Sequence, residues 1–258
     1  EKRLDLLGRK IIMKRKVKTK VKGFRTTDGA GVKLVRVLGN LTTKEFDPIL
    51  MLDSFDSINP DDYTAGFPMH PHRGIETISY VSRGKMVHRD SLGNEAGISD
   101  GEVQWMNSGS GIMHEEMVPA AERLLGVQLW LNLPAKDKMS KPSYNSIKNE
   151  DIKEIEIEGG KIRLLAGKYG EHEGYKGDYL SMDYYDIHLN ADAEVTLTME
   201  EDDSVMVFTL LGDVYIDGEH IEEKTAVKLT EGDSLTIKNG NEKAQVLYMN
   251  SRALNEPV

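Results

Sequence analysis

The stretch from Phe67 to Met117 begins FPMHPHRGIETISYV (67–81) and ends NSGSGIMHEEM (107–117). Alternate side chains of a β-strand share one face, so His70 and His72 would project together, and so would His114 and Glu116. Two such strands lying side by side would place three imidazoles and one carboxylate around a point. That donor set suits a borderline divalent metal such as Fe, Ni, Mn, Cu or Zn, with one or two coordination positions left open for a ligand.

A plainer interpretation is that these are surface histidines beside a turn. A single His-x-His pair would favour that interpretation, whereas two pairs of ligand type with glycine turns between them favour a metal site. The histidines of the second half, His172, His188 and His220, are scattered and unpaired. We interpret these three as ordinary surface or core residues.

The composition of the 258 residues limits the possible classes of protein. With 39% hydrophobic and 29% charged residues it is ordinary for a soluble globular protein, and the net charge of −10 argues against general binding of nucleic acid. Because the sequence has no cysteine, any metal must be held by histidine and carboxylate. The lack of cysteine, of a membrane-length apolar run and of a visible secretory signal favours a cytoplasmic location without membrane partners.

Residues 1–23 form a basic segment, in which ten Lys or Arg residues are set against only Glu1 and Asp5. The charge of this segment is +8 (10 − 2), so the remainder carries −18 (−10 − 8). Such a run can contact nucleic acid, but it is more typical of a solvated edge strand whose lysines discourage pairing with another chain. The sequence KRKVKTKV after Met13 is typical of a natural start, so we expect residues 1–12 to be an upstream or non-native extension.

Short β-rich runs separated by turn signals follow one another along the chain. We expect strands at 32–38, 76–81, 85–89, 102–106 and 126–131, with a buried apolar run at 46–55. This spacing predicts an antiparallel barrel or sandwich. A second half repeats the plan, because the pairs Gly84/Gly101 and Gly212/Gly232 are 17 and 20 residues apart and follow similar runs. We therefore predict two barrels of like topology.

The repeat also tests the metal hypothesis. The second-half positions that correspond to the four candidate ligands are Thr198, Glu200, Gln245 and Leu247. No histidine lies at or near any of them, even if the register slips by a residue or two. The second barrel can therefore keep the scaffold while lacking the ligands.

Two motifs carry a resemblance: His70-x-His72-x3-Glu76-x7-Gly84 and Gly101-x5-Asn107-x-Gly109-x4-His114 resemble the cupin motifs. The longer stretches DPILMLDSF, HPHRGIETISYV, HRDSLGN, VQWMNSGSGIMHEEM and LNEPV are similar to the pirin family of bicupins, from about residue 14 to the end. The resemblance implies an all-β fold of two tandem cupin-type antiparallel β-barrels with short helical connections. We place the first barrel at 13–133, a linker at 134–146 and the second barrel at 147–258.

The pirin resemblance implies one divalent metal, usually Fe(II), in the first barrel. The ligand positions of the family correspond here to His70, His72, His114 and Glu116. In most cupins the motif glutamate, here Glu76, is the ligand, whereas in pirins the carboxylate two residues after the last histidine takes that place. Strand alternation favours Glu116 independently. We expect Glu76 to support the site from behind the ligands or to be structural, and Glu115 to point away.

The resemblance further implies a metal-dependent dioxygenase of the quercetin 2,3-dioxygenase type, which opens the ring of a flavonol with dioxygen and releases carbon monoxide. The metal would lower the pKa of the substrate hydroxyl, and Glu116 would act as catalytic base. Because only neutral imidazole binds metal, we expect metal occupancy and activity to fall as the pH drops towards 5. The candidate lining of an apolar substrate slot is Trp105, Met106, Ile112, Met113 and Met117, although apolar strand residues more often pack in a core.

Two alternatives stay open. Some pirins are implicated as regulatory partners of transcription proteins, so the metal would instead sense redox state and the basic strand at 14–22 would contact a protein partner. Alternatively, the metal is a structural zinc. Pirins usually continue beyond LNEPV with a strand and a C-terminal helix, so the resemblance also implies that the sequence is truncated or lacks this cap.

Overall fold

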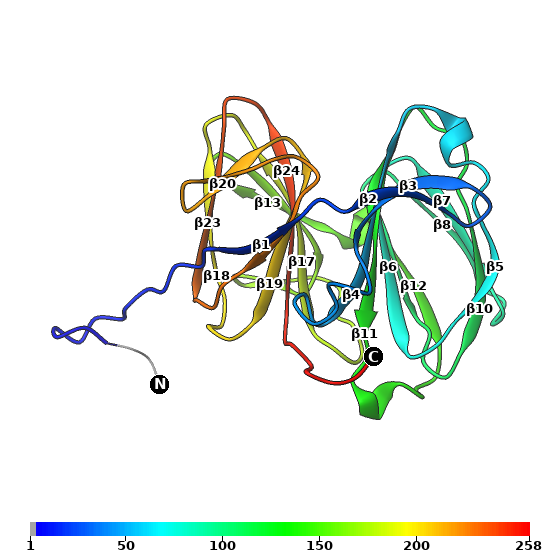
Figure 1. Cartoon of the computed structure of the whole chain (residues 1–258), viewed down its shortest axis with the longest axis horizontal. Helices are drawn as coiled ribbons and strands as arrows, with labels where there is room; N and C mark the ends of the chain where they lie inside the picture. The colour runs from blue at the N-terminus through cyan, green and yellow to red at the C-terminus, as the bar shows by residue number, and fades with distance from the viewer. Residues whose placement is uncertain (1–3) are drawn as a thin grey trace.

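The computed structural model describes residues 4–258 and shows an all-β protein of two barrels lying side by side (Figure 1). Each barrel consists of a seven-stranded sheet opposed by a four-stranded sheet, and the two seven-stranded sheets face each other in the middle of the molecule. The predicted all-β fold with two antiparallel barrels is confirmed. Residues 1–3, which belong to the expected extension 1–12, lie outside the described part.

The first barrel consists of strands that follow one another along the chain. They are β2 (Phe24–Asp28), β3 (Val32–Leu38), β4 (Ile49–Ser57), β5 (Phe67–His72), β6 (Ile75–Arg83), β7 (Lys85–Asp90), β8 (Glu95–Ser99), β9 (Glu102–Asn107), β10 (Ile112–Met117), β11 (Leu124–Asn132) and β12 (Ser143–Ile147). The strand order is β12-β9-β6-β11-β4-β3-β2 in the large sheet and β5-β10-β7-β8 in the small sheet. Paired neighbours are antiparallel.

The second barrel has the same plan but includes a strand from the beginning of the chain. Its strands are β1 (Val17–Val21), β13 (Lys153–Ile157), β14 (Gly160–Ala166), β17 (Met182–Leu189), β18 (Glu194–Thr198), β19 (Ser204–Leu211), β20 (Val214–Ile216), β21 (Glu219–Ile221), β22 (Ala226–Leu229), β23 (Ser234–Asn239) and β24 (Ala244–Ser251). The large sheet has the order β1-β22-β19-β24-β17-β14-β13 and the small sheet β18-β23-β20-β21. A separate hairpin joins β15 (Lys168–Tyr169) to β16 (His172–Glu173).

Helical structure within residues 4–258 is confined to short 3-10 turns. They are η1 (Pro60–Asp62), η2 (Ala135–Asp137) and η3 (Asn149–Asp151). These turns agree with the short helical connections that the resemblance implies. No helix in the described part of the chain has the length and apolar character needed to span a lipid bilayer.

The chain exchanges strands between the two barrels. β1 lies at the edge of the second barrel's large sheet, where Val21 pairs with Ala226 of β22, and Figure 1 shows the chain then crossing to the first barrel. β12 completes the first barrel, where Tyr144 pairs with Met106 of β9. The strand pairing therefore differs from the division drawn from the sequence, which assigned 17–21 to the first barrel and 143–146 to a linker. That division assumed that consecutive strands are neighbours in space, which is the usual case but not the case here.

The basic segment contains an edge strand, as its pattern predicts. On β1, the Lys20 Nζ lies 2.6 Å from a carboxylate oxygen of Glu219. Just before β1, Arg15 is almost fully buried and its guanidinium donates to the carbonyl oxygen of Gly232 at 2.7 Å. These contacts attach the start of the chain to the second barrel.

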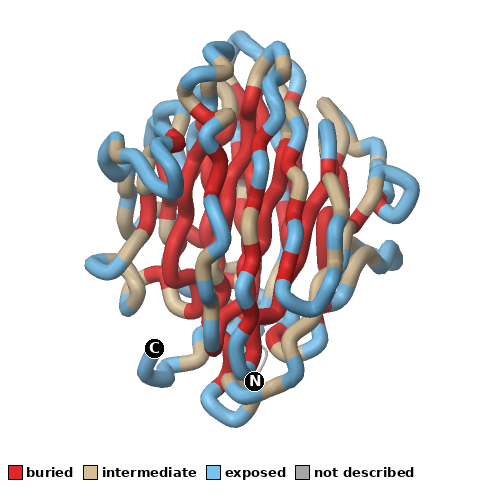
Figure 2. Tube along the Cα trace, turned by 90° about the vertical axis from the view of Figure 1, so that its right-hand side faces the viewer, coloured by how far each residue is buried: buried red, intermediate tan, exposed pale blue. Residues whose placement is uncertain are grey.

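Apolar packing between the two large sheets joins the barrels. Side chains of β6, β9 and β11 meet those of β14, β17, β19 and β24, and the cluster includes Ile78, Trp105, Leu129, Tyr184, Phe208 and Leu247. The central strands are consequently buried on both faces: every residue of β9 is buried, as is the run 75–81 of β6. Figure 2 shows buried residues following the strands and exposed residues gathering in the loops.

The interiors of the two barrels differ in chemistry. The second barrel is filled by apolar side chains, including Ile187, Val207, Val214, Leu235 and Val246. The first barrel has a smaller apolar cluster that includes Val32, Phe55, Met86 and Ile98. It also buries polar side chains, including Gln104, His114, Glu116 and Gln128. One architecture therefore encloses a solid apolar core in one barrel and a polar site in the other.

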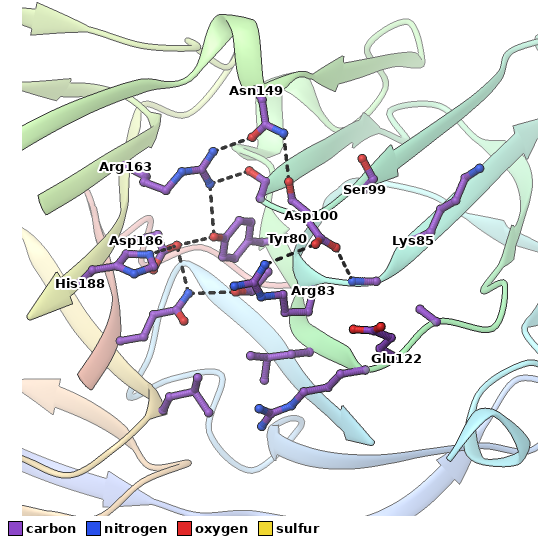
Figure 3. A pocket seen from close by; sticks show the side chains of 18 of the residues that line it. Tyr80, Arg83, Lys85, Ser99, Asp100, Glu122, Asn149, Arg163, Asp186 and His188 are labelled. Atoms are coloured by element: carbon purple, nitrogen blue, oxygen red, sulfur yellow. Dashed lines mark hydrogen bonds and ion pairs between the residues drawn. The ribbon is translucent and has the colours of Figure 1, made fainter. Parts of the chain in front are cut away.

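A hydrogen-bond network around Asp186 connects the barrels beside their apolar interface, on the wall of an open cleft of about 1040 Å³ (Figure 3). Asp186 of β17 is fully buried, and its Oδ2 accepts a hydrogen bond from the Tyr80 hydroxyl of the first barrel. The same oxygen accepts from Gln245 Nε2 at 3.0 Å and from His188 Nε2 at 2.9 Å. A buried carboxyl group is tolerated only while it keeps such donors, so the network constrains how the barrels are placed.

We expect Tyr80→Phe to destabilise the protein by about 1–3 kcal/mol, because the change removes a donor from the buried Asp186 carboxyl while preserving the ring. Urea denaturation followed by fluorescence measures the loss. The control is Tyr215→Phe, which alters a tyrosine that is 40% exposed and should change stability little. Equal stabilities of the Tyr80 and Tyr215 variants would contradict this role of the network.

Candidate metal centre

The pairing of β5 with β10 brings the three candidate histidines together. His114 lies directly opposite His70, while His72 lies opposite Ile112, the residue two positions before His114 on the same face of β10. The Nε2 atom of His70 is 3.0 Å from that of His72 and 3.0 Å from that of His114. The potential ligand atoms of the three side chains all lie within 4.8 Å of one another.

The donor chemistry of this group fits a metal ion. His70 donates through Nδ1 to the carbonyl oxygen of Pro68 at 2.7 Å, so in the neutral ring its Nε2 carries a lone pair. Two nitrogen ligands bound at right angles and about 2.1 Å from one metal lie about 3.0 Å apart. The spacing of His70 to each of its two neighbours matches that value. These three residues would hold the metal that the sequence predicts.

Burial keeps two of these imidazoles neutral. It lowers the pKa of His72 from 6.5 to about 4, with a further decrease from the nearby His70. Burial also lowers the pKa of His114 to about 2, and the neighbouring histidines add to the effect. Protonated imidazole cannot bind a metal, so both side chains are in the ligand form at neutral pH.

Glu116, the fourth predicted ligand, faces the same interior as His114, but its carboxylate is held by two amides. Gln104 donates from Nε2 to Oε1, and Gln128 donates from Nε2 to both oxygens at 3.1 and 3.2 Å. Burial raises the pKa of Glu116, while the Gln128 hydrogen bond opposes the rise. The oxygens of Glu116 are not part of the cluster within 4.8 Å. The pairing of β10 with β5 shifts register between these two positions, because His114 lies opposite His70 and Glu116 opposite Phe67.

Comparison with known protein families covers both barrels. Residues 31–131 match the family described as Pirin, and residues 184–258 match the Pirin C-terminal cupin domain. The chain belongs to the pirin family. The family resemblance stated from the sequence is therefore confirmed.

Individual relatives agree with this assignment. A Pseudomonas aeruginosa protein provisionally named as a quercetin 2,3-dioxygenase is 39% identical over 246 residues, covering 92% of this chain and 86% of that protein. Human pirin is 34% identical over 254 residues, covering 95% of this chain and 85% of human pirin. A crystal structure of quercetin 2,3-dioxygenase from Acinetobacter baumannii superposes with a TM-score of 0.85 at 29% identity, covering 94% of this chain and 88% of that one.

Two predicted site residues face away from the histidines. Trp105 and Glu76 lie at the interface between the barrels, where Trp105 Nε1 donates to Glu76 Oε1 at 3.1 Å and the indole packs against Tyr175. Burial raises the pKa of Glu76 to about 7, and its Oε2 has no hydrogen-bond partner among residues 4–258. Trp105 therefore belongs to the inter-barrel core, and Glu76 has a structural place there.

The remaining predicted lining residues divide between the two faces of their strands. Met106 and Ile112 are buried, Ile112 on the same face of β10 as His114. Met113 and Met117 are 39% and 43% exposed and lie on the opposite face, so they do not line the interior. Glu115 lies on that outer face too, and its Oε1 accepts from Arg89 Nε at 2.6 Å, as alternation predicts.

Sequence reasoning missed several neighbours of the histidines. Trp130 of β11 packs edge-on against His72 with ring centroids 5.3 Å apart, and its buried Nε1 has no hydrogen-bond partner in the described part of the chain. Behind His114 lie His88 and Asp90 of β7. The i, i+2 spacing of His88 and Asp90 is the same signal that identified the other pairs, whereas nothing in one sequence distinguishes Trp130 from a core residue.

We expect the metal-free protein to lose stability as the pH falls from 6.5 towards 4. The unfolded chain takes up protons on His72 and His114 near pH 6.5, whereas the folded chain does not until about pH 4 and about pH 2, so protons favour unfolding. Each such histidine costs roughly 1 kcal/mol per pH unit in this window. Thermal melting of the chelated protein at pH 7.5, 6.5 and 5.5 measures the slope.

A matched pair of variants isolates the contribution of the buried ring. His72→Asn should flatten the dependence of melting temperature on pH, whereas the same change at the exposed His172 should leave the slope unchanged. If the two variants have equal slopes, His72 is not held neutral by burial.

Proposed function

We propose that this protein is a metal-dependent dioxygenase that opens the ring of a flavonol, with quercetin as the test substrate and dioxygen as the second substrate. The observation that carries the proposal is the convergence of the Nε2 atoms of His70, His72 and His114 inside one barrel. Relatives that bear the name quercetin 2,3-dioxygenase supply the reaction type. Ring opening would incorporate dioxygen and release carbon monoxide.

We propose Fe(II) as the resident metal; Ni, Mn, Cu and Zn suit the same imidazole donors. When bound, such a metal would supply a Lewis acid that lowers the pKa of a flavonol hydroxyl. The three histidines would hold it, with Glu116 as the fourth ligand if its carboxylate turns from the two glutamines. The protein's contribution is then to position the donors and to keep their rings neutral.

Glu116 is our candidate for the group that accepts the hydroxyl proton of the substrate. Its burial raises its pKa, which makes the carboxylate a stronger base than an exposed glutamate. The amides of Gln104 and Gln128 direct its oxygens within the interior. Trp130 would help to bind the substrate beside His72, since its indole Nε1 can donate a hydrogen bond to a molecule bound there.

The proposal is tested by oxygen uptake with quercetin, measured on protein loaded separately with each of the five metals and on chelated protein. We expect uptake of one dioxygen per quercetin in at least one metal form and none after chelation. His114→Ala should reduce kcat/KM by at least 100-fold, because it removes a donor from the three-histidine group. The control His172→Ala alters an exposed histidine in the other barrel and should retain activity.

Undiminished uptake by chelated protein or by His114→Ala would contradict the proposed mechanism. Stable metal binding without any oxygen uptake would instead favour the regulatory alternative, in which the metal centre senses redox state and the protein acts by binding a partner.

The role of Glu116 is tested by Glu116→Gln, which preserves the size of the side chain but removes its basicity. We expect kcat to fall roughly 100- to 10,000-fold, the range for loss of a positioned general base. The matched control is Glu115→Gln, the same change one residue away on the outer face, where the side chain meets Arg89. If the two variants have equal turnover, Glu116 does not act as the base.

A further inference from the structure

The neighbours of His114 on β7 form a linear chain of polar groups that ends at the metal centre. Asp90 and His88 are both buried, and His88 Nε2 lies 2.7 Å from Asp90 Oδ2. The other nitrogen of His88, Nδ1, lies 3.3 Å from Nδ1 of His114. The sheet produces this order, because His114 pairs with Asp90 and Glu116 pairs with His88 across β7 and β10. Tyr144 stacks on His88 with ring centroids 3.9 Å apart, which fixes the plane of the ring.

The positions of the hydrogens follow from what each group can accept. Asp90 Oδ1 accepts from the backbone amides of Leu92 and Asn94 at 2.9 and 3.2 Å, so this side chain acts as an acceptor. His88 must then donate from Nε2 to Asp90, which leaves a lone pair on its Nδ1. That lone pair can be satisfied only if His114 carries its hydrogen on Nδ1. The free lone pair of His114 is therefore on Nε2, the atom that faces His70.

We propose that Asp90 and His88 are positioning residues, which select the tautomer of His114 that can bind a metal. His70 obtains the same tautomer by a different route, the carbonyl oxygen of Pro68. A partner on the far ring nitrogen both orients a histidine ligand and sets its tautomer, and its loss typically weakens metal binding 10- to 100-fold. The inference rests on the proposed metal site but is independent of the flavonol reaction.

Asp90→Asn tests the proposal by replacing the oxygen that accepts from His88 and from the Asn94 side chain with a donor. The two backbone amides hold the remaining oxygen on the side of the turn, so the new amide group faces His88 as a donor. The side chain of Asn94, whose Nδ2 donates to the replaced oxygen at 2.9 Å, must then turn its own carbonyl oxygen towards the new amide. His88 must then accept at Nε2 and donate from Nδ1, which forces the hydrogen of His114 onto Nε2. The metal-free variant should therefore show His114 in the opposite tautomer. Long-range ¹H–¹⁵N NMR of histidine-labelled, metal-free protein at pH 7.5 measures this, with the His114 signals assigned from His114→Asn.

Metal affinity gives a second readout that does not depend on activity. We expect the dissociation constant for Co(II), measured by calorimetry without substrate, to rise 10- to 100-fold in Asp90→Asn. The matched control is Asp213→Asn. Asp213 also places one oxygen on a backbone amide, that of Glu223, and the other 2.8 Å from Nε2 of a histidine, His220, but it is exposed and lies in the second barrel. This control should bind Co(II) as the unmodified protein does.

Two changes at His88 separate the effect of its hydrogen bonds from the effect of its packing. They test the proposed role of His88 even if Asp90→Asn does not fold. A glutamine can donate its amide to Asp90 and accept at its carbonyl from His114, so His88→Gln should stay within a few-fold of the original affinity. His88→Leu cannot do either and should bind Co(II) 10- to 100-fold more weakly.

Unchanged Co(II) affinity and an unchanged His114 tautomer in Asp90→Asn would overturn the proposal, as would equal affinities of His88→Gln and His88→Leu. Failure of the unmodified protein to bind Co(II) would contradict the metal site itself, while the tautomer measurement would still decide the role of Asp90. Normal Co(II) binding without quercetin turnover would contradict only the proposed reaction.

Discussion

Three imidazole nitrogens that converge inside a barrel are the constraint on which the first half of this protein depends. Lone pairs at hydrogen-bonding distance repel one another unless a proton or a cation lies between them. Burial lowers the pKa values of His72 and His114 and so disfavours added protons. Such a group could hold a metal ion, which binds neutral imidazoles. The features around it, the antiparallel pairing of β5 with β10 and the hydrogen bonds behind the rings, keep these lone pairs convergent.

The two barrels show what the same scaffold does with and without this group. In the second barrel the interior is closed by apolar side chains such as Val207 and Leu235, which contribute stability through packing. In the first barrel the interior holds polar groups that cost free energy unless each has a partner. Gln104 and Gln128 partner Glu116, and Asp90 partners His88. The apolar interface between the large sheets joins the polar barrel to the well-packed one.

The sequence was sufficient to predict the barrels and the convergence of His70, His72 and His114, because strand alternation and glycine turns are local signals. It was not sufficient to predict which face of a central strand looks into the site. Strands β6 and β9 are buried on both faces. Hydrophobicity alone therefore does not tell whether Trp105 or its neighbour Gln104 faces the interior of the first barrel. That is why Trp105 was expected to line the substrate slot but lies between the barrels. Glu76, for which a structural place was one of the two expectations, lies there beside it. Nothing in the local sequence of β1 indicates that it pairs in the second barrel, because its partner β22 lies about 200 residues away.

The most direct test of the account is X-ray absorption spectroscopy combined with elemental analysis of protein purified without added metal. The account predicts one transition metal per chain, with imidazole scattering from three histidines at about 2.0–2.2 Å. It also predicts that the number of imidazole ligands falls from three to two in His72→Ala. Protein that carries no metal even after incubation with Fe(II), Ni(II) or Zn(II), or a metal without imidazole neighbours, would contradict it.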